Sequence, residues 1–417
     1  MNDKRDTRRD FVKRSAALVG GLVLSNQLSN ARQPVGIRVV DQHITYVNKE
    51  YNTVFRPVPD DPGFRLHHGL PVLPAKLEVP FPWKEENLYG RSPGHCITDN
   101  VFLEPGKPWV LQLFISTPGI GDTQTGSPQY KVWYRTSTDN GKEFSPVRQV
   151  IIGGYTGNHP IDAVEIGRNG FNVDYGRPIV KASNGEIMVP IGLHPWDNEK
   201  KKIYLPVENA YGFQDAGVLI GSWMPDGSDV RWRFGNWLRI DHNLSTRGLS
   251  EPSIVELRTP GHFAMVARGS NLGRLELPCH TWLSFSRDYC RTWSAPRPLA
   301  YSDGSSFFVT TAQSALFTST TTGKTYWIGN LNTKNPKASF PRYPLVIGEI
   351  DLDRFGVKRK TVSVIDTYQS GKDIETVQLS NFSIMEHKEK PEIIVLFTRR
   401  DRSGSAEKPS WFRIQLV

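Results

Sequence analysis

Hydrophobic and polar positions alternate along this chain in short segments rather than in long helical stretches. From about residue 36 onward, runs of five to eight residues alternate between apolar and polar positions, separated by Gly, Pro, Asn and Asp. This period is typical of β-strands, and a sustained helical period is almost missing. The pattern predicts an all-β protein. The clearest strand segments are Trp109 to Ser116, Tyr130 to Thr136, Ile187 to Gly192, Gly217 to Trp223, Ser253 to Leu257, His262 to Ala267, Thr281 to Ser286, Thr325 to Gly329, Leu345 to Ile350 and Ile393 to Thr398.

The strand segments recur in groups with a common order of strand, polar turn, buried strand, loop and aromatic strand. Groups begin near residues 91, 177, 251, 309 and 376. Residues 36 to 80 supply the remaining strands or a closing unit. Repeated four-stranded units of this kind indicate a β-propeller, here of about six blades.

Two of these groups end in a similar turn. One reads Ser137-Thr138-Asp139-Asn140-Gly141-Lys142-Glu143-Phe144, and the other reads Ser286-Arg287-Asp288-Tyr289-Cys290-Arg291-Thr292-Trp293. The Asp is suited to bond the backbone of its own turn, Gly allows a positive φ, and the final aromatic residue fills the space between sheets. We expect these turns to be structural.

Composition supports a globular, turn-rich protein. Of 417 residues, 38% are hydrophobic and 11% aromatic, with 36 Gly and 30 Pro. Three cysteines, Cys96, Cys279 and Cys290, are too few for a disulfide scaffold or a zinc ribbon and leave at least one thiol unpaired. We expect the stability of the fold to come from its core.

The charge balance favours an anionic partner. The formal net charge is +9, and it is +6 without the first 31 residues, which hold six Lys/Arg and three Asp. No run of five or six basic residues occurs, so nucleic acid and membrane surfaces are not expected partners. A carboxylated or sulfated ligand fits this balance better.

The N-terminus has the three parts of a bacterial export signal. Arg8 and Arg9 precede an apolar run from Ser15 to Ser25, and small residues end at Ala31. The segment resembles a twin-arginine signal, and its apolar run is shorter than the roughly 20 residues of a membrane span. We expect residues 1–31 to be a signal peptide. Residues 32–417 would then be a single propeller domain, secreted or periplasmic, without a membrane span.

Several motifs, in their order along the chain, resemble the sialidase (neuraminidase) superfamily of β-propellers over roughly residues 85 to 400. These are Arg91-Ser92-Pro93, the two Asp-box-like turns, and Glu251 at the head of a strand that is followed by Arg268. The resemblance implies that Arg91, Arg268 and Arg342 clamp a substrate carboxylate. Guanidinium groups bind carboxylates in a bidentate manner and repel one another without an anion.

The same resemblance implies two carboxylates with catalytic roles. Asp122, in the loop before the strand that leads into the first Asp box, takes the place of the acid/base residue. Glu251 would be the second carboxylate. The chain departs from the family at the nucleophile, because Leu379 stands where sialidases have a Tyr, and Tyr368 is a possible substitute.

Further residues were considered for the same pocket. Arg177 and Tyr175, in Asp174-Tyr175-Gly176-Arg177-Pro178, occupy a blade entry comparable to Arg91-Ser92-Pro93 and are expected to line it. Histidines near strand ends are suited to acid/base chemistry, although a structural role is the commoner one. These are His95, His159, His194, His242 and His280. No ligand spacing indicates a metal, and we expect no cofactor.

Three functions are compatible with these residues. The first is an exported sialidase-like glycoside hydrolase that acts on an acidic sugar or acidic glycan. The second is a lyase that acts on a uronate-containing polysaccharide and needs no nucleophile. The third is a glycan-binding propeller without activity, and in all three cases we expect a monomer.

Overall fold

The protein is all-β in a computed structural model that describes residues 36–44, 46, 61, 63–68, 99–116, 130–173, 179–400 and 409–416. Those ranges contain no α-helix and a single 3₁₀ turn, η2 (Arg359–Thr361). All ten segments expected to be strands are strands, and Thr281–Ser286 matches residue for residue. The periodicity was therefore a reliable guide to the elements.

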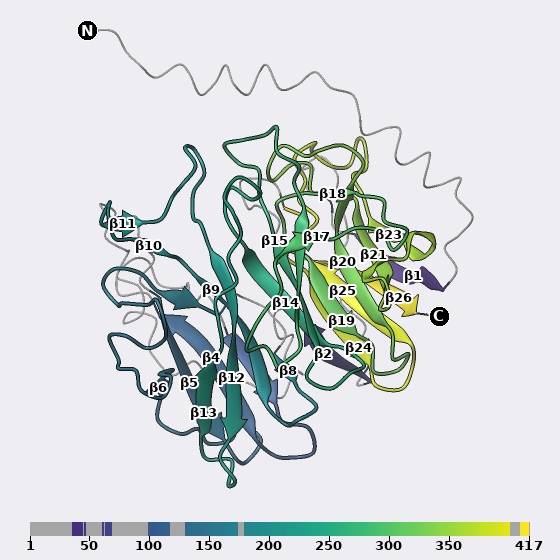
Figure 1. Cartoon of the computed structure of the whole chain (residues 1–417). Helices are drawn as coiled ribbons and strands as arrows, with labels where there is room; N and C mark the ends of the chain where they lie inside the picture. Colours follow the sequence, from purple (N-terminus) through teal and green to yellow (C-terminus); the bar gives the residue numbers. More distant parts are fainter. Residues whose placement is uncertain are drawn as a thin grey trace.

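Five antiparallel sheets of four to six strands follow one another along the chain (Figure 1). The first contains β3 (Asp99–Leu103), β4 (Val110–Ser116), β5 (Lys131–Ser137) and β6 (Arg148–Gln149). The second contains β7 (Phe171–Asn172), β8 (Val180–Lys181), β9 (Ile187–Leu193), β12 (Asp215–Trp223) and β13 (Val230–Phe234). A separate ribbon pairs β10 (Trp196–Asp197) with β11 (Lys202–Ile203).

The third and fourth sheets follow the same antiparallel plan. The third contains β14 (Ser250–Glu256), β15 (Phe263–Arg268), β16 (Thr281–Ser286) and β17 (Arg297–Pro298). The fourth contains β18 (Phe308–Val309), β19 (Ala315–Thr318), β20 (Thr325–Asn332), β21 (Leu345–Asp351), β22 (Gly356–Val357) and β23 (Ser363–Asp366).

The fifth sheet joins strands from both ends of the chain. Its C-terminal strands are β24 (Ser383–His387), β25 (Glu392–Phe397) and β26 (Ser410–Leu416). β1 (Ile37–His43) pairs with β26, and β2 (Phe64–His68) pairs with β24. The N-terminal segment thus supplies strands that complete the last sheet, as expected for residues 36 to 80.

The core lies between successive sheets. Separate clusters of buried apolar side chains join the first sheet to the second, the second to the third, the third to the fourth, and the fourth to the fifth. Strands in the middle of this stack are covered on both faces, and every residue of β9 and β20 is buried. Each sheet therefore packs on its neighbours along the chain, and the arrangement of the sheets as a propeller of about six blades stays a prediction.

The two similar turns have the same hydrogen bonds. Asp139 Oδ1 accepts from the backbone N–H groups of Lys142 and Glu143, both at 3.0 Å. Asp288 Oδ1 accepts in the same way from Arg291 and Thr292, at 3.1 and 2.9 Å. Both turns connect the third and fourth strands of their sheets. The expectation that the Asp bonds its own turn is correct.

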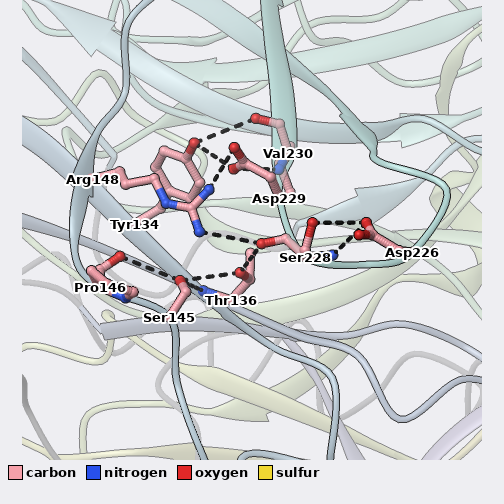
Figure 2. A network of polar contacts seen from close by, with 9 residues as sticks. All are labelled: Tyr134, Thr136, Ser145, Pro146, Arg148, Asp226, Ser228, Asp229 and Val230. Carbon is pink, nitrogen blue, oxygen red and sulfur yellow. Dashed lines mark hydrogen bonds and ion pairs between the residues drawn. The ribbon is translucent and has the colours of Figure 1, made fainter.

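A polar network fixes the first sheet against the turn between β12 and β13. Tyr134 Oη donates to Asp229 Oδ1 at 2.8 Å, and Thr136 Oγ1 donates to the Ser228 carbonyl at 2.8 Å. Arg148 Nη1 lies 2.5 Å from Asp229 Oδ2. Figure 2 shows these side chains pointing toward one another between the two sheets. Burial, together with the Asp229 carboxylate, raises the pKa of Tyr134, so this phenol stays a neutral donor.

Candidate functional site

Glu251 and Arg268 meet at the edge of the third sheet. β14 and β15 pair with Ser250 opposite Arg268, and the register shifts between Ser250 and Ser253. Glu251 lies in this irregular stretch with a φ of 51°. Its Oε1 accepts a hydrogen bond from Arg268 Nη1 at 2.8 Å, with 23% and 14% of the two side chains exposed. A β-bulge redirects a side chain out of the regular alternation, and here the two charged groups form an ion pair.

Arg342 approaches the same edge from the loop before β21. Its guanidinium is held by neutral acceptors, since Nη1 donates to Ser380 Oγ at 3.1 Å and Nε donates to the Ser339 carbonyl at 3.3 Å. Its own carbonyl accepts from the Leu379 N–H at 3.0 Å. The position of Arg342 is therefore fixed by two segments of the chain.

Arg247 is a third arginine at this edge, and the sequence analysis did not identify it. Its Nε donates to the Tyr211 carbonyl at 2.5 Å, and its guanidinium carbon lies 4.1 Å from the centroid of the Tyr211 ring. Tyr211 is 64% exposed. The two side chains form a stacked cation–π pair between the loop before β12, which carries Tyr211, and the loop before β14, which carries Arg247.

Backbone contacts bring the loops that carry these residues together. Thr246 N–H donates to the Ser270 carbonyl at 2.9 Å, two residues after Arg268. Gln214 N–H donates to the Arg247 carbonyl at 3.1 Å. Next to Arg247, Gly248 has a φ of 70°, and a Cβ there would lie 2.1 Å from the Gln214 carbonyl oxygen. Only glycine permits this close approach.

The Arg342 loop is tied to the same segment through Asn271. Ala338 N–H donates to Asn271 Oδ1 at 2.9 Å, and Asn271 Nδ2 donates to the Pro336 carbonyl at 3.0 Å. Asn271 is the third residue after Arg268. Arg268 ends β15, and the loops that carry Arg247 and Arg342 are both bonded to the segment directly after it.

The electrostatics of the cluster reflect this crowding of like charges. Burial and, to a smaller extent, repulsion from Arg268 lower the pKa values of Arg247 and Arg342, each to about 10. Glu251 acts on both arginines in the opposite direction. At neutral pH both guanidinium groups remain cationic, so among the described residues of the cluster three positive charges face the single carboxylate of Glu251. Such an arrangement is suited to an anionic ligand.

The described residues include part of the predicted site. Among the described residues, Arg268 pairs with Glu251, and Arg342 lies close enough to both for their charges to interact. The roles of these three residues stay predictions. Predicted residues outside the described residues are Arg91, Asp122, Tyr175 and Arg177.

The segment expected to carry the nucleophile is part of the core. Leu379 is fully buried between the fourth and fifth sheets. Tyr368 stacks on Tyr343 with ring centroids 5.4 Å apart, and both rings pack against the same core cluster. The Tyr368 alternative therefore has the contacts of a packing residue.

Of the histidines that are candidates for acid/base chemistry, His194 is buried and His280 is half-buried. Burial lowers the pKa of His194 to about 4, and its Nε2 lies 2.9 Å from Gln214 Nε2. Burial also lowers the pKa of His280, which stacks on Phe308. Both imidazoles are neutral at pH 7 and have structural contacts.

The described residues contain two free cysteines and no grouped metal ligands. Cys279 and Cys290 are both buried and free. Burial raises the pKa of each thiol. In the ranges that the structure describes, no three His, Cys, Asp or Glu side chains are grouped so as to hold a metal ion. The same ranges contain no helix long and apolar enough to cross a membrane.

Comparisons with known proteins give only distant likenesses. No protein-family model matches the chain, and no curated protein matches it. Among solved structures it is similar to a protein of unknown function from Dyadobacter fermentans, with 11% identity, 76% of each chain covered and a TM-score of 0.45. It is also similar to the Hadza microbial sialidase Hz136, with 13% identity, 76% of this chain and 52% of that chain covered, and a TM-score of 0.47.

A third similar structure is the sialidase of Trypanosoma rangeli in complex with sialic acid. The identity is 14%, the match covers 79% of this chain and 45% of that chain, and the TM-score is 0.43. The chain spans about half the length of these two sialidases. Identities and TM-scores of this size assign neither an activity nor a site residue.

Proposed function

We propose that this protein is an exported carbohydrate-active enzyme, a sialidase-like glycoside hydrolase, whose substrate is an acidic sugar or acidic glycan. The five sheets are blades of a β-propeller of about six blades, and the Glu251 edge is its substrate-binding face. The convergence of Arg247, Arg268 and Arg342 around Glu251 carries this proposal. Half-buried guanidinium groups repel one another, and a bound carboxylate relieves that repulsion.

In this proposal the arginines hold the anion and the carboxylates perform the chemistry. Arg268 and Arg342 bind the carboxylate of the sugar, with Arg91 as a further clamp residue. Glu251 activates the attacking group, and Asp122 is the general acid. Arg177 and Tyr175 line the same pocket. Because Leu379 is buried where sialidases have a Tyr, direct attack by water between the two carboxylates is the favoured route.

Binding without turnover is the second candidate function. Its support is the same burial of Leu379, which leaves the chain without a nucleophile at the family's position. A protein of this kind would retain the arginine cluster and its affinity for acidic glycans. Turnover is therefore the property that separates the two candidates.

The test measures release of reducing sugar and of unsaturated product from a panel of sialylated, uronic and sulfated glycans by the full chain. We expect hydrolysis, a loss of roughly 10²–10⁴-fold in rate for Glu251→Gln, and little activity for Arg268→Ala. Arg231→Gln is the matched control because Arg231 is exposed on β13. Affinity without turnover would favour the binding protein, and an absorbance increase near 235 nm would indicate a lyase. No binding of any acidic glycan would refute the proposal.

A further inference from the structure

The charge of the arginine cluster exceeds what one sugar carboxylate neutralises. Arg268 is paired with Glu251 at 2.8 Å. Within the described part of the chain, neither Arg247 nor Arg342 has an ion-pair partner within 4 Å. Two positive charges therefore remain at one edge of the molecule after the pairing of Arg268.

The two remaining guanidinium groups are held by different loops and in similar ways. Arg342 donates through Nε and Nη1 to Ser339 and Ser380. Arg247 donates through Nε to the carbonyls of Tyr211 and Gly212, at 2.5 and 3.4 Å. All these acceptors are neutral. Each guanidinium is thus fixed in place by uncharged groups, and its charge is left for another partner.

Arg247 also has a feature that Arg342 lacks. Its guanidinium stacks on the ring of Tyr211, which is 64% exposed. An exposed aromatic ring beside a fixed cation is suited to contact a sugar face and its acidic group together. The Arg247–Tyr211 pair lies on the loops before β12 and β14, whereas Arg342 belongs to the loop before β21.

We infer that the ligand carries two anionic groups, one bound by Arg268 and Arg342 and the other bound by Arg247 beside Tyr211. This inference rests on the proposed function, because it concerns the same site and names its substrate class. The second anion is either a sulfate or carboxylate on the same sugar or the carboxylate of an adjacent acidic sugar. The shared chemistry is a dianionic saccharide.

The experiment compares ligands of one and two charges on the full chain by isothermal titration calorimetry at low salt. The monoanions are methyl glucuronide and N-acetylneuraminate. The dianions are a sulfated methyl glucuronide, with both charges on one ring, and a disaccharide of two glucuronates. We expect the wild-type chain to bind one of the dianions about tenfold or more tightly than either monoanion, because a hydrogen bond to a charged group contributes about 1.5–3 kcal/mol. The preferred dianion identifies the source of the second charge.

Variants test whether Arg247 binds the second anionic group. We expect Arg247→Gln to weaken the preferred dianion about tenfold or more and to change monoanion affinity by less than about threefold. Arg342→Gln should weaken both classes, and Arg231→Gln, which removes the same charge on exposed β13, should weaken neither. Arg247→Lys keeps the charge without the planar fork and should fall between wild type and Arg247→Gln. Thermal midpoints of all variants establish that each is folded.

The outcomes separate this inference from the proposed function. Equal affinity of the wild-type chain for monoanions and dianions refutes the inference of a second anionic group and leaves the proposed function standing. An equal loss of affinity for monoanions and dianions in Arg247→Gln also refutes this inference, because Arg247 would then bind the same anionic group as Arg268 and Arg342. Absence of binding to any of these saccharides refutes the proposed function and, with it, this inference.

Discussion

The backbone of Glu251 provides a test of how the site is built. Its φ of 51° is in the left-handed region, and Pro252 follows directly. For a residue with a Cβ this conformation costs about 1–2 kcal/mol relative to glycine, and a following proline disfavours helical conformations of the residue before it. Glu251→Ala and Glu251→Gly both remove the carboxylate and its bond to Arg268. The two variants therefore differ in the strain of this backbone conformation and in the freedom that glycine adds to the unfolded chain.

We expect Glu251→Gly to be more stable than Glu251→Ala by about 1–2 kcal/mol. In a chain of 417 residues this corresponds to a thermal midpoint higher by roughly 1–2 °C, which differential scanning calorimetry resolves. The control is Arg231, an exposed residue inside β13, where glycine should be less stable than alanine by about 0.5–1 kcal/mol. If alanine were the more stable residue at both positions, the strain assigned to Glu251 would be refuted. Both Glu251 variants should lack activity, because both remove the carboxylate.

Two further predictions concern buried charged groups away from the arginine cluster. Arg399 is fully buried between the carboxylates of Asp366 and Asp373. Arg399→Met should therefore lower the free energy of unfolding, measured in urea, by about 3–5 kcal/mol, and the triple variant that adds Asp366→Asn and Asp373→Asn should recover part of that loss. A wild-type free energy of unfolding for Arg399→Met would contradict the prediction. Burial lowers the pKa of His194 from 6.5 to about 4. As pH falls, His194 is therefore protonated in the unfolded chain before it is protonated in the folded chain. The stability contributed by neutral His194 is lost as pH falls from about 6.5 toward 4. Thermal midpoints of His194→Gln should depend less on pH across this window than those of wild type, and identical slopes would contradict the assignment.

Local pattern was sufficient for the strands and for the two repeated turns. β13 illustrates the reason, since Val230 and Trp232 face inward and Arg231 and Arg233 face outward. In the turns, Asp139 and Asp288 bond groups within four residues, so no distant part of the chain is needed to predict them. Interactions between residues that are close together in the sequence can be predicted from the sequence.

Arg247 was missed because its place depends on contacts between distant loops. Its partners Tyr211 and Gly212 lie 36 and 35 residues earlier in the chain. A signal was present in Thr246-Arg247-Gly248, where a basic residue adjoins a glycine just before the strand of Glu251. The same pattern occurs at many surface turns, so the sequence does not distinguish them. Glu251 and Arg268 were named as site residues through the family resemblance, whereas the ion pair between them is seen only in the structure.

The pairing of β1 with β26 has a consequence for the synthesis of the chain. Arg38 and Gln415 contact each other across 377 residues of sequence. At about 5–20 residues per second, roughly 20–75 s pass between translation of the first strand and of its partner. During that interval β1 is an unpaired strand that can associate with other chains. The fifth sheet can therefore be completed only after β26 has been translated, and until then β1 depends on protection from association with other chains.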